Sequence, residues 1–420
     1  MIGNITVFRK RKFTYKKKLN YDRFLSPLLL LPFSLVIISS FLIKSIQRQL
    51  TTNDALNHFL MGILGYLVAI IISYIPLQKV KSFVLPFYLL VLSFLILVYF
   101  FGISMYGAQR WLSLGFITFQ PSEVAKLSTL LALAAIFERF CLKSFKDLIL
   151  PFVVAIIPWT LIFFQPDLGT SLVLIFLFLI LLYWVQVPLE AIAIVLLCVI
   201  TSILSMISTS LIFLWIPLIC LWAYKTFKKQ KIFILLTLAL HGLVAKFTPF
   251  LWNVGLKDYQ KDRLILFLEP GKDPLGGGYH LLQSKIAIGS GGLFGTGLLQ
   301  GKLTNLQFIP EQHTDFIFSA LGEEVGFLGS MLVVLIFFLL IFKLIKIAKH
   351  ARTDFESLIV IGIASIFVFQ IIINIYMTIG LGPVTGIPLP FMSYGRTALL
   401  INFVFIGLAL STNKRCISVR

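Results

Sequence analysis

Long apolar segments, separated by short polar connectors, follow one another along almost the whole chain. Most have roughly 18 to 25 residues, the length that an α-helix needs to cross a hydrocarbon core of about 30 Å. The 420 residues are 59% hydrophobic and 13% charged, and the mean hydropathy is +0.98. A soluble core could not bury that much apolar surface. The chain is therefore predicted to be an all-α, polytopic integral membrane protein.

The apolar segments predict up to twelve crossings within one membrane domain, 1–420, with no second, soluble domain. The predicted spans are 24–43, 58–77, 83–103, 121–140, 148–164, 168–185, 189–207, 210–224, 231–252, 325–346, 358–380 and 391–410. The segment 314–346 is too long for one perpendicular crossing at about 1.5 Å per residue. We expect a short helix at 314–322 and then a span from Val325.

Basic residues gather at the ends of the apolar segments and set the predicted orientation. The net charge is +19, and basic turns lie at 78–82, 224–231 and 347–352. Lys and Arg are enriched in cytoplasmic loops, so both termini are expected in the cytoplasm, with 1–22 as a basic tail facing anionic lipid. Nucleic acid is not an expected partner, and the four cysteines show no metal-ligand spacing.

The segment 257–324 is the one long stretch that apolar residues do not dominate, and all but its last two residues belong to a predicted large extracytoplasmic loop, 253–322. By topology, three other segments reach the same outer face. They are the loop that carries Arg110 and Trp111, the turn 165–170, and the connector 380–396. A functional site, if the chain has one, is expected where these segments meet.

Charged residues at the start of the fourth span allow two interpretations. Charges at the end of a span are costly, so Arg110, Glu123 and Lys126 suggest a functional role. Glu123 and Lys126 are also three residues apart on one helix face, which predicts a local ion pair. The sequence alone leaves both interpretations open.

Carboxylates of the large loop also have two interpretations. Asp273 stands in GKDPLGGGYH, where glycine-rich backbone could cradle phosphate and the carboxylate could act as a general base. Capping of the turn before proline is the simpler explanation, and capping of the next helix is equally simple for His313 and Asp315. For the pair Glu323 and Glu324, an interfacial position is simpler than an ion pathway.

Five motifs, in this order along the chain, resemble the SEDS proteins, the shape, elongation, division and sporulation group that includes RodA, FtsW and SpoVE. They are GAQRWLSLGFITFQPSEVAKL, QPDLGTSLV, the stretch 259–297, IPEQHTDFIFSALGEEVGFLG and GLGPVTGIPLPFMSYG. The resemblance covers almost the whole chain. PEQHTDFIF is more similar to RodA members than to FtsW members, which tend to carry PEAHTDF.

The resemblance implies an inverting peptidoglycan glycosyltransferase that polymerises lipid II at the outer face of the bacterial cytoplasmic membrane. Its implied partners are a class B penicillin-binding protein and the elongation machinery that maintains cell shape, and its implied cofactor is a divalent cation, Mg²⁺ or Mn²⁺, whose ligands the sequence does not identify. Asp273 matches the family's essential aspartate, the candidate general base. The implied substrate-binding residues are Arg110, Trp111, Glu123, Lys126, Lys285, His313 and Asp315.

Two features depart from the family pattern. The family usually has about ten spans, so residues 187–252 predict an extra hairpin, and Arg396 stands where members usually have a second glycine. Two other functions are compatible with the resemblance: a lipid II flippase, and a non-catalytic scaffold of the elongation machinery. The concentration of polar residues on the outer side favours the enzyme.

Overall fold

The computed structural model describes residues 26–47, 53–105, 108–114, 117–140, 145–227, 231–255, 258–269, 277–306 and 312–417. These residues fall into two compact units. The main unit comprises the described residues of Arg11–Leu181 and Arg263–Arg420, and the inserted unit comprises those of Leu182–Asp262.

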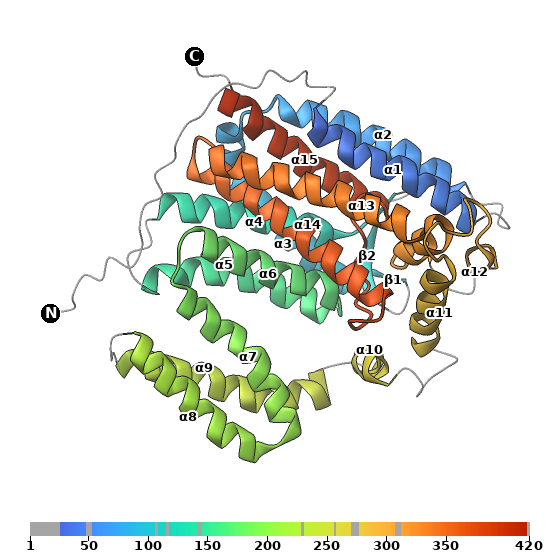
Figure 1. Ribbon diagram of the computed structural model, residues 1–420. Helices are drawn as coiled ribbons and strands as arrows, with labels where there is room; N and C mark the ends of the chain where they lie inside the picture. Colours follow the sequence, from blue (N-terminus) through green and yellow to red (C-terminus); the bar gives the residue numbers. More distant parts are fainter. Residues whose placement is uncertain are drawn as a thin grey trace. The chain divides into compact units, whose positions relative to one another are not determined.

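The main unit is built almost entirely of helices (Figure 1). Its helices are α1 (Pro27–Ile46), α2 (Asp54–Ser73), α3 (Leu77–Phe101), α4 (Pro121–Arg139), α5 (Ile149–Phe164), α6 (Leu168–Trp184), α11 (Gly277–Ser290), α12 (Lys302–Asn305), α13 (Ile317–His350), α14 (Asp354–Thr378) and α15 (Arg396–Ile417), with a 3-10 turn at Phe145–Leu148. A small antiparallel sheet, ordered β1 (Ile103–Met105), β2 (Ala108–Leu114) and β3 (Ile117–Phe119), joins α3 to α4.

The inserted unit consists of α7 (Leu189–Ile207), α8 (Thr209–Thr226) and α9 (Lys231–Phe250), which a π-turn, Leu251–Gly255, follows. Helix α10 (Asp258–Leu268) carries the chain back to the main unit. Polar side chains join the three helices, because the Thr201 hydroxyl lies 2.6 Å from His241 Nδ1 and accepts from Trp215 Nε1 at 3.0 Å. The Thr248 hydroxyl also donates to Ser202 at 3.2 Å.

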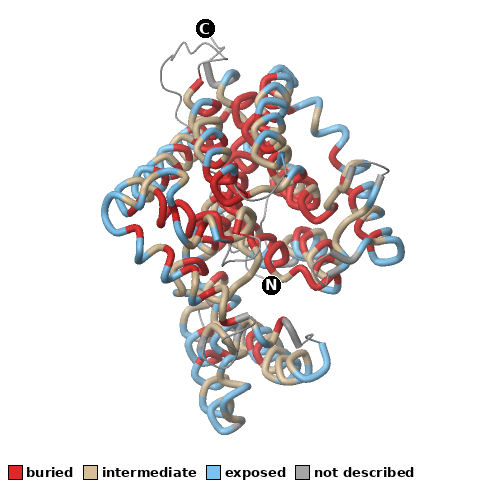
Figure 2. The backbone as a smooth tube through the Cα atoms, turned by 90° about the vertical axis from the view of Figure 1, so that its right-hand side faces the viewer, coloured by how far each residue is buried: buried red, intermediate tan, exposed pale blue. Residues whose placement is uncertain are grey.

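Eight of the described helices are long and apolar enough to cross a membrane, namely α1, α2, α3, α7, α9, α13, α14 and α15, and α5, α6 and α8 are shorter apolar helices. With α4 they correspond to the predicted spans, so the all-α polytopic class is confirmed. Helix α4 is more polar, but it packs against α3, α5, α14 and α15, and 14 of its residues are buried. Figure 2 shows buried positions concentrated where the helices pack.

The last predicted span, 391–410, was wrong at its start, because α15 begins only at Arg396. Pro388 and Pro390 lack the N–H that a helix requires, and Phe391 has a φ of 64°, which a right-handed helix excludes. The connector 380–395 therefore stays irregular, and its backbone groups are available to other segments.

Within α1–α6 and within α13–α15, successive helices run in opposite directions, whether the connection is short, as between α1 and α2, or long, as between α3 and α4, where Lys81 near the start of α3 pairs with Glu138 near the end of α4. One end of this unit consequently collects the N-termini of α2, α4, α6, α13 and α15 and the C-termini of α1, α3, α5 and α14. We call it the site end. The opposite end collects the turns between α2 and α3 and between α13 and α14.

Helix α13 is broken at Gly326, whose φ of 72° and ψ of −167° are not helical. The predicted short helix followed by a span is thus confirmed. Beyond the break, Phe327 N donates to Gly292 O at 2.9 Å and Leu328 N to Leu293 O at 3.1 Å. A Cβ at position 326 would lie 2.2 Å from Gly295 N, so only glycine allows the loop after α11 to approach so closely.

Candidate active site

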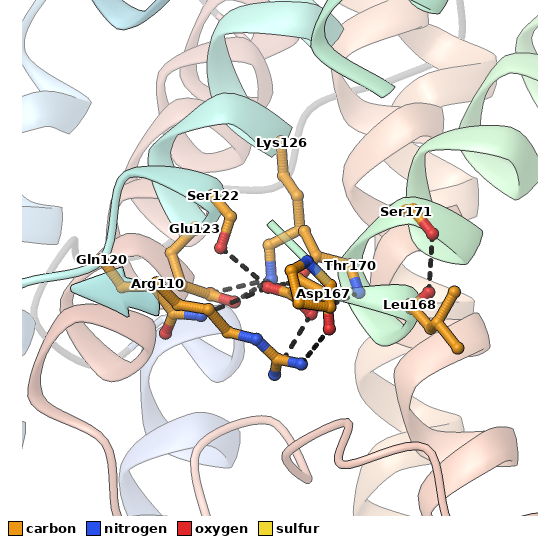
Figure 3. A network of polar contacts seen from close by, with 10 residues as sticks. Arg110, Gln120, Ser122, Glu123, Lys126, Asp167, Leu168, Thr170 and Ser171 are labelled. Carbon is orange, nitrogen blue, oxygen red and sulfur yellow. Dashed lines mark hydrogen bonds and ion pairs between the residues drawn. The ribbon is translucent and has the colours of Figure 1, made fainter. Parts of the chain in front are cut away.

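Arg110 projects from β2 toward the start of α6 and meets the carboxylate of Asp167 (Figure 3). Its Nη1 lies 3.6 Å from Asp167 Oδ1, and its Nη2 donates to the carbonyl of Pro166. Both side chains are largely buried, with 18% and 6% of their surfaces exposed. Within the described residues, the buried Nε of Arg110 has no hydrogen-bond partner.

Asp167 also holds the N-termini of α4 and α6 together. It accepts from Thr170 N at 3.3 Å and from the Thr170 hydroxyl at 3.0 Å, and so caps the N-terminus of α6. It accepts as well from the Ser122 hydroxyl at 3.0 Å and from Gln120 Nε2 at 3.4 Å. This second role was not predicted, although the turn QPDLGT was recognised as part of a motif.

Glu123 and Lys126 form the predicted ion pair. Lys126 Nζ donates to Glu123 Oε1 at 2.8 Å and lies 2.8 Å from Oε2. The exposed fractions of the two side chains are 4% and 1%, so the pair is buried rather than solvated. Together with Arg110 and Asp167, the pair makes a compact cluster of two cations and two anions. Removing one member of a buried pair would leave the other charge buried without a partner, which is energetically costly.

A second group of residues surrounds the turn 312–316, which carries His313 and Asp315. Asn374, on α14, donates from Nδ2 to the carbonyls of Asp315 and Ile387, both at 2.8 Å. The backbone N of Tyr394 donates to His313 O at 2.9 Å. The turn is thereby fixed between α14 and the connector 380–395.

Glycines of the connector bring its backbone close to charged side chains. Gly386 has a φ of 72°, and a Cβ there would lie 3.3 Å from Asp315 Oδ2 and 3.5 Å from Arg263 Nη1. At Gly380, a Cβ would lie 1.7 Å from Cε of Lys285, an exposed residue of α11. Arg263 was not predicted as a site residue, although it lies inside a quoted motif.

The connector also joins this second group to the Arg110 cluster. A Cβ at Gly169, in the first turn of α6, would lie 2.8 Å from Ile387 Cγ1 and 3.1 Å from Thr385 O. Trp111 pairs with Ile103 across the sheet and follows Arg110 on β2. Since successive strand side chains point to opposite faces, Trp111 does not join the cluster. Asp273, the predicted base, lies outside the described residues.

Glu323 and Glu324 have structural partners. The Glu323 carboxylate accepts from Leu303 N at 2.8 Å, Thr304 N at 2.9 Å and the Thr304 hydroxyl at 2.6 Å. Glu324 accepts from the Ser45 hydroxyl and from Leu299 N, the latter at 3.2 Å. These bonds fasten α12, the loop before it and the end of α1 to α13, so no ion pathway is needed to explain the pair.

The described residues do not form a metal site of their own, because no group of three or more His, Cys, Asp or Glu side chains among them could hold an ion. The carboxylates of Glu123 and Asp167 are engaged by Lys126 and Arg110. The described residues therefore do not supply a complete set of protein ligands for a divalent cation.

Fold and site together define a polytopic α-helical membrane protein with a buried cluster of charges at one end. The chain belongs to the FtsW, RodA and SpoVE family, whose model, described as "Cell cycle protein", matches residues 22–214 and 207–416. This is the SEDS family that the motifs resemble.

Relatives and solved structures agree with this assignment. Peptidoglycan glycosyltransferase MrdB of Escherichia coli K12 is 34% identical over 360 residues, which cover 84% of this chain and 85% of MrdB. Peptidoglycan glycosyltransferase RodA of Treponema pallidum is 31% identical over 399 residues, covering 88% and 92%. A chain from a structure on the coordination of polymerization and crosslinking by a peptidoglycan synthase complex superimposes with a TM-score of 0.72 at 26% identity, covering 96% and 100%. Thermus thermophilus RodA gives a TM-score of 0.62 at 24% identity, covering 96% and 99%, which supports the fold.

Proposed function

We propose that this chain is a peptidoglycan glycosyltransferase that polymerises lipid II into glycan strands during cell elongation and shape maintenance. The relatives described above are named peptidoglycan glycosyltransferases. The observation that carries the proposal is the buried cluster of Arg110, Asp167, Glu123 and Lys126. It lies at the same end as the turn of His313, where a charged substrate could be bound and oriented.

The distribution of charge supports an outward-facing site. Lys79, Lys81, Arg139, Lys349 and Arg352 all lie at the end of the main unit opposite the site end. Cytoplasmic loops are enriched in Lys and Arg, so we infer that this opposite end faces the cytoplasm, together with both termini. The site end then faces the outer side of the bacterial cytoplasmic membrane, where lipid II would be polymerised.

In the proposed reaction, the acceptor sugar's 4-hydroxyl attacks the anomeric carbon of the donor with inversion. A new glycosidic C–O bond forms, the bond from the anomeric carbon to the diphosphate oxygen breaks, and Asp273 takes the proton from the hydroxyl. The leaving undecaprenyl diphosphate gains negative charge, which a fixed cation stabilises. Arg110 suits this role because Asp167 orients it and its buried Nε is a donor without a partner among the described residues.

The remaining predicted residues have supporting roles in the proposal. Lys285, His313 and Asp315 would line the cavity, and Trp111 would contact the lipid-linked substrate from the sheet. The divalent cation is kept as an expectation from the family resemblance, and no step of the reaction is assigned to it. A class B penicillin-binding protein is the proposed partner, since the similar synthase complex is described as coordinating polymerization and crosslinking.

The test compares three forms of the chain, each purified with its cognate penicillin-binding protein and supplied with labelled lipid II and Mg²⁺ or Mn²⁺. The native chain should make long glycan strands and Asp273→Asn should make none. Asp262→Asn, which alters an exposed carboxylate of α10, should match the native chain. Equal polymer from native and Asp273→Asn would remove Asp273 as the base.

Two further arms of this experiment complete it. No polymer from the native chain would contradict the proposed function and direct the work to a lipid II flipping assay in liposomes. Chelation with EDTA should abolish polymerisation, and added Mg²⁺ or Mn²⁺ should restore it. Unchanged polymerisation in EDTA would remove the cation from the proposal.

A further inference from the structure

Asn374 lies near the end of α14 and is completely buried, although its side chain is polar. Its Nδ2 donates to two backbone carbonyls, those of Asp315 and Ile387, both at 2.8 Å. The first carbonyl belongs to the turn 312–316 and the second to the connector 380–395. One side chain therefore holds two segments, through residues that lie 59 and 13 positions from it in the sequence.

The two carbonyls determine the orientation of the Asn374 amide. A carbonyl oxygen only accepts, so both must face the NH2 group, whose two N–H donors match them in number. The remaining oxygen, Oδ1, is buried and has no hydrogen-bond partner among the described residues. A buried polar atom without a partner is destabilising, so this geometry holds two segments although it leaves Oδ1 unsatisfied. No other neutral side chain of this size supplies two donors from one atom.

Ile387 continues the connection to the Arg110 cluster. It is buried, and a Cβ on Gly169, in the first turn of α6, would lie 2.8 Å from its Cγ1. Gly169 precedes Thr170, which donates to the Asp167 carboxylate (Figure 3). That carboxylate lies 3.6 Å from Arg110. Because the contact at Gly169 leaves no space for even one more carbon atom, a shift of Ile387 would displace the start of α6 and the carboxylate that orients Arg110.

The other bond of Asn374 acts on the turn that carries His313. The connector reaches this turn directly as well, because Tyr394 N donates to His313 O at 2.9 Å. Tyr394 is itself fixed, since its hydroxyl donates to Asp54 Oδ1 at 2.8 Å. The connector is thus bonded to the turn at Tyr394 and bridged to it through Asn374 at Ile387. In this closed set of bonds, Asn374 is the member that belongs to a helix.

We propose that Asn374 is a positioning residue that couples the two parts of the candidate active site, the turn of His313 and the cluster of Arg110 and Asp167. It acts through two backbone carbonyls. It does not contact the substrate, because it is completely buried and both of its donors are occupied. The inference rests on the proposed function, because both parts are assigned to binding and orienting lipid II.

Hydrogen exchange on the purified chain in detergent tests the coupling without turnover. Two amides report on the two parts: Tyr394 N, bonded to His313 O, and Thr170 N, bonded to the Asp167 carboxylate. Asn374→Leu removes both donors and should speed exchange at both amides about tenfold, the effect of losing roughly 1.4 kcal/mol of hydrogen bonding. Asn374→Ser, which is smaller and retains a single donor, should accelerate the same two amides and serves if the leucine variant does not fold.

Thr378→Val is the matched control. Thr378 is also buried in α14, one turn after Asn374, and its hydroxyl donates to Ile375 O within the helix at 2.8 Å. This variant should leave exchange at both reporting amides unchanged. The amide of Ile379, bonded to Ile375 O at the end of α14, should exchange at the native rate in every variant.

Polymerisation of labelled lipid II by the complex with the penicillin-binding protein gives the second readout. Asn374→Leu should lower kcat about 10- to 100-fold, because small displacements of groups that orient a substrate are enough for such losses. KM should stay within about threefold of native, since the buried amide makes no contact with the substrate. Thr378→Val should match the native chain in both constants.

Four results would overturn the inference. Unchanged exchange at Tyr394 or at Thr170 would show that Asn374 does not join the two parts, and equal acceleration at Ile379 would indicate general loss of stability. Native kcat despite faster exchange would remove the coupling from the reaction, and a rise in KM alone would indicate a direct substrate contact. If the native complex makes no polymer, the proposed function fails, and the exchange comparison still decides whether Asn374 couples the two segments.

Discussion

Gly326 offers a sharp test of how the loop after α11 is held against α13. We consider Gly326→Ala. Its φ of 72° and ψ of −167° lie in a region that is essentially restricted to glycine, where another residue costs about 1 to 3 kcal/mol. The added Cβ would lie 2.2 Å from Gly295 N, 2.7 Å from Phe294 C and 2.8 Å from Leu293 O. All three are backbone atoms, so the loop must move as a whole.

The displaced loop would lose two hydrogen bonds, from Phe327 N to Gly292 O and from Leu328 N to Leu293 O. Each contributes about 0.5 to 1.5 kcal/mol, so the total loss of stability, strain included, is about 2 to 6 kcal/mol. Melting temperatures of mid-sized domains fall by roughly 2 to 4 °C per kcal/mol. We therefore expect the apparent melting temperature of Gly326→Ala to fall by at least roughly 4 °C.

Tryptophan fluorescence during heating of the purified chain in detergent measures this change, and hydrogen exchange at the amides of Phe327 and Leu328 reports on the two bonds directly. Gly289→Ala is the matched control. Gly289 lies in α11, and a Cβ there would meet nothing within 4 Å, so alanine should be neutral or stabilise by up to about 1 kcal/mol. If both variants melt at the same temperature as the native chain and the hydrogen exchange rates of Phe327 and Leu328 are unchanged, the close approach at Gly326 is not what holds the loop.

Two other predictions concern ionisable groups, one a buried ion pair and the other a partly buried histidine. Glu123→Gln should destabilise the chain by about 3 to 5 kcal/mol, because it leaves the charge of Lys126 buried and unpaired, and Glu123→Gln with Lys126→Met should recover most of that loss. If the loss of stability in the double variant equals the sum of the losses in the two single variants, the two side chains are not coupled and the prediction is wrong. Burial lowers the pKa of His280, so the unfolded chain binds a proton that the folded chain resists. Stability should accordingly fall as the pH drops below about 6.5, and His280→Asn should reduce that fall in melting temperature between pH 7.5 and 5. If the melting temperature of His280→Asn depends on pH as that of the native chain does, His280 does not cause the loss of stability at low pH.

Features of the fold that depend on neighbouring residues could be predicted from the sequence. The apolar segments identified the long helices, the length of 314–346 indicated a break that the structure places at Gly326, and the spacing of Glu123 and Lys126 predicted their pairing. In each case the signal lies within one element. The predicted start of the last span was wrong because hydropathy counts apolar residues and carries no information on backbone angles such as the positive φ of Phe391.

The contacts that assemble the site could not be predicted in this way. Tyr394 and Asp54 are 340 residues apart, and Glu324 and Ser45 are 279 residues apart. Periodicity within a segment says nothing about which helix ends become neighbours. Asp167 shows the same limit, because its place in the turn 165–170 does not reveal its bonds to Ser122 and Gln120 at the start of α4.

The number of helices in the inserted unit bears on how an insertion of this size can be accommodated. Helices α7, α8 and α9 are three, which is an odd number. If each crosses the bilayer, the chain emerges on the same side as it would after a single crossing. Two of the three helices therefore lengthen the chain without changing the side on which it emerges. Adding two helices leaves the direction in which each later helix crosses the membrane unchanged. One extra or one missing helix would instead invert α13, α14 and α15, and would deliver the two halves of the site to opposite sides of the membrane.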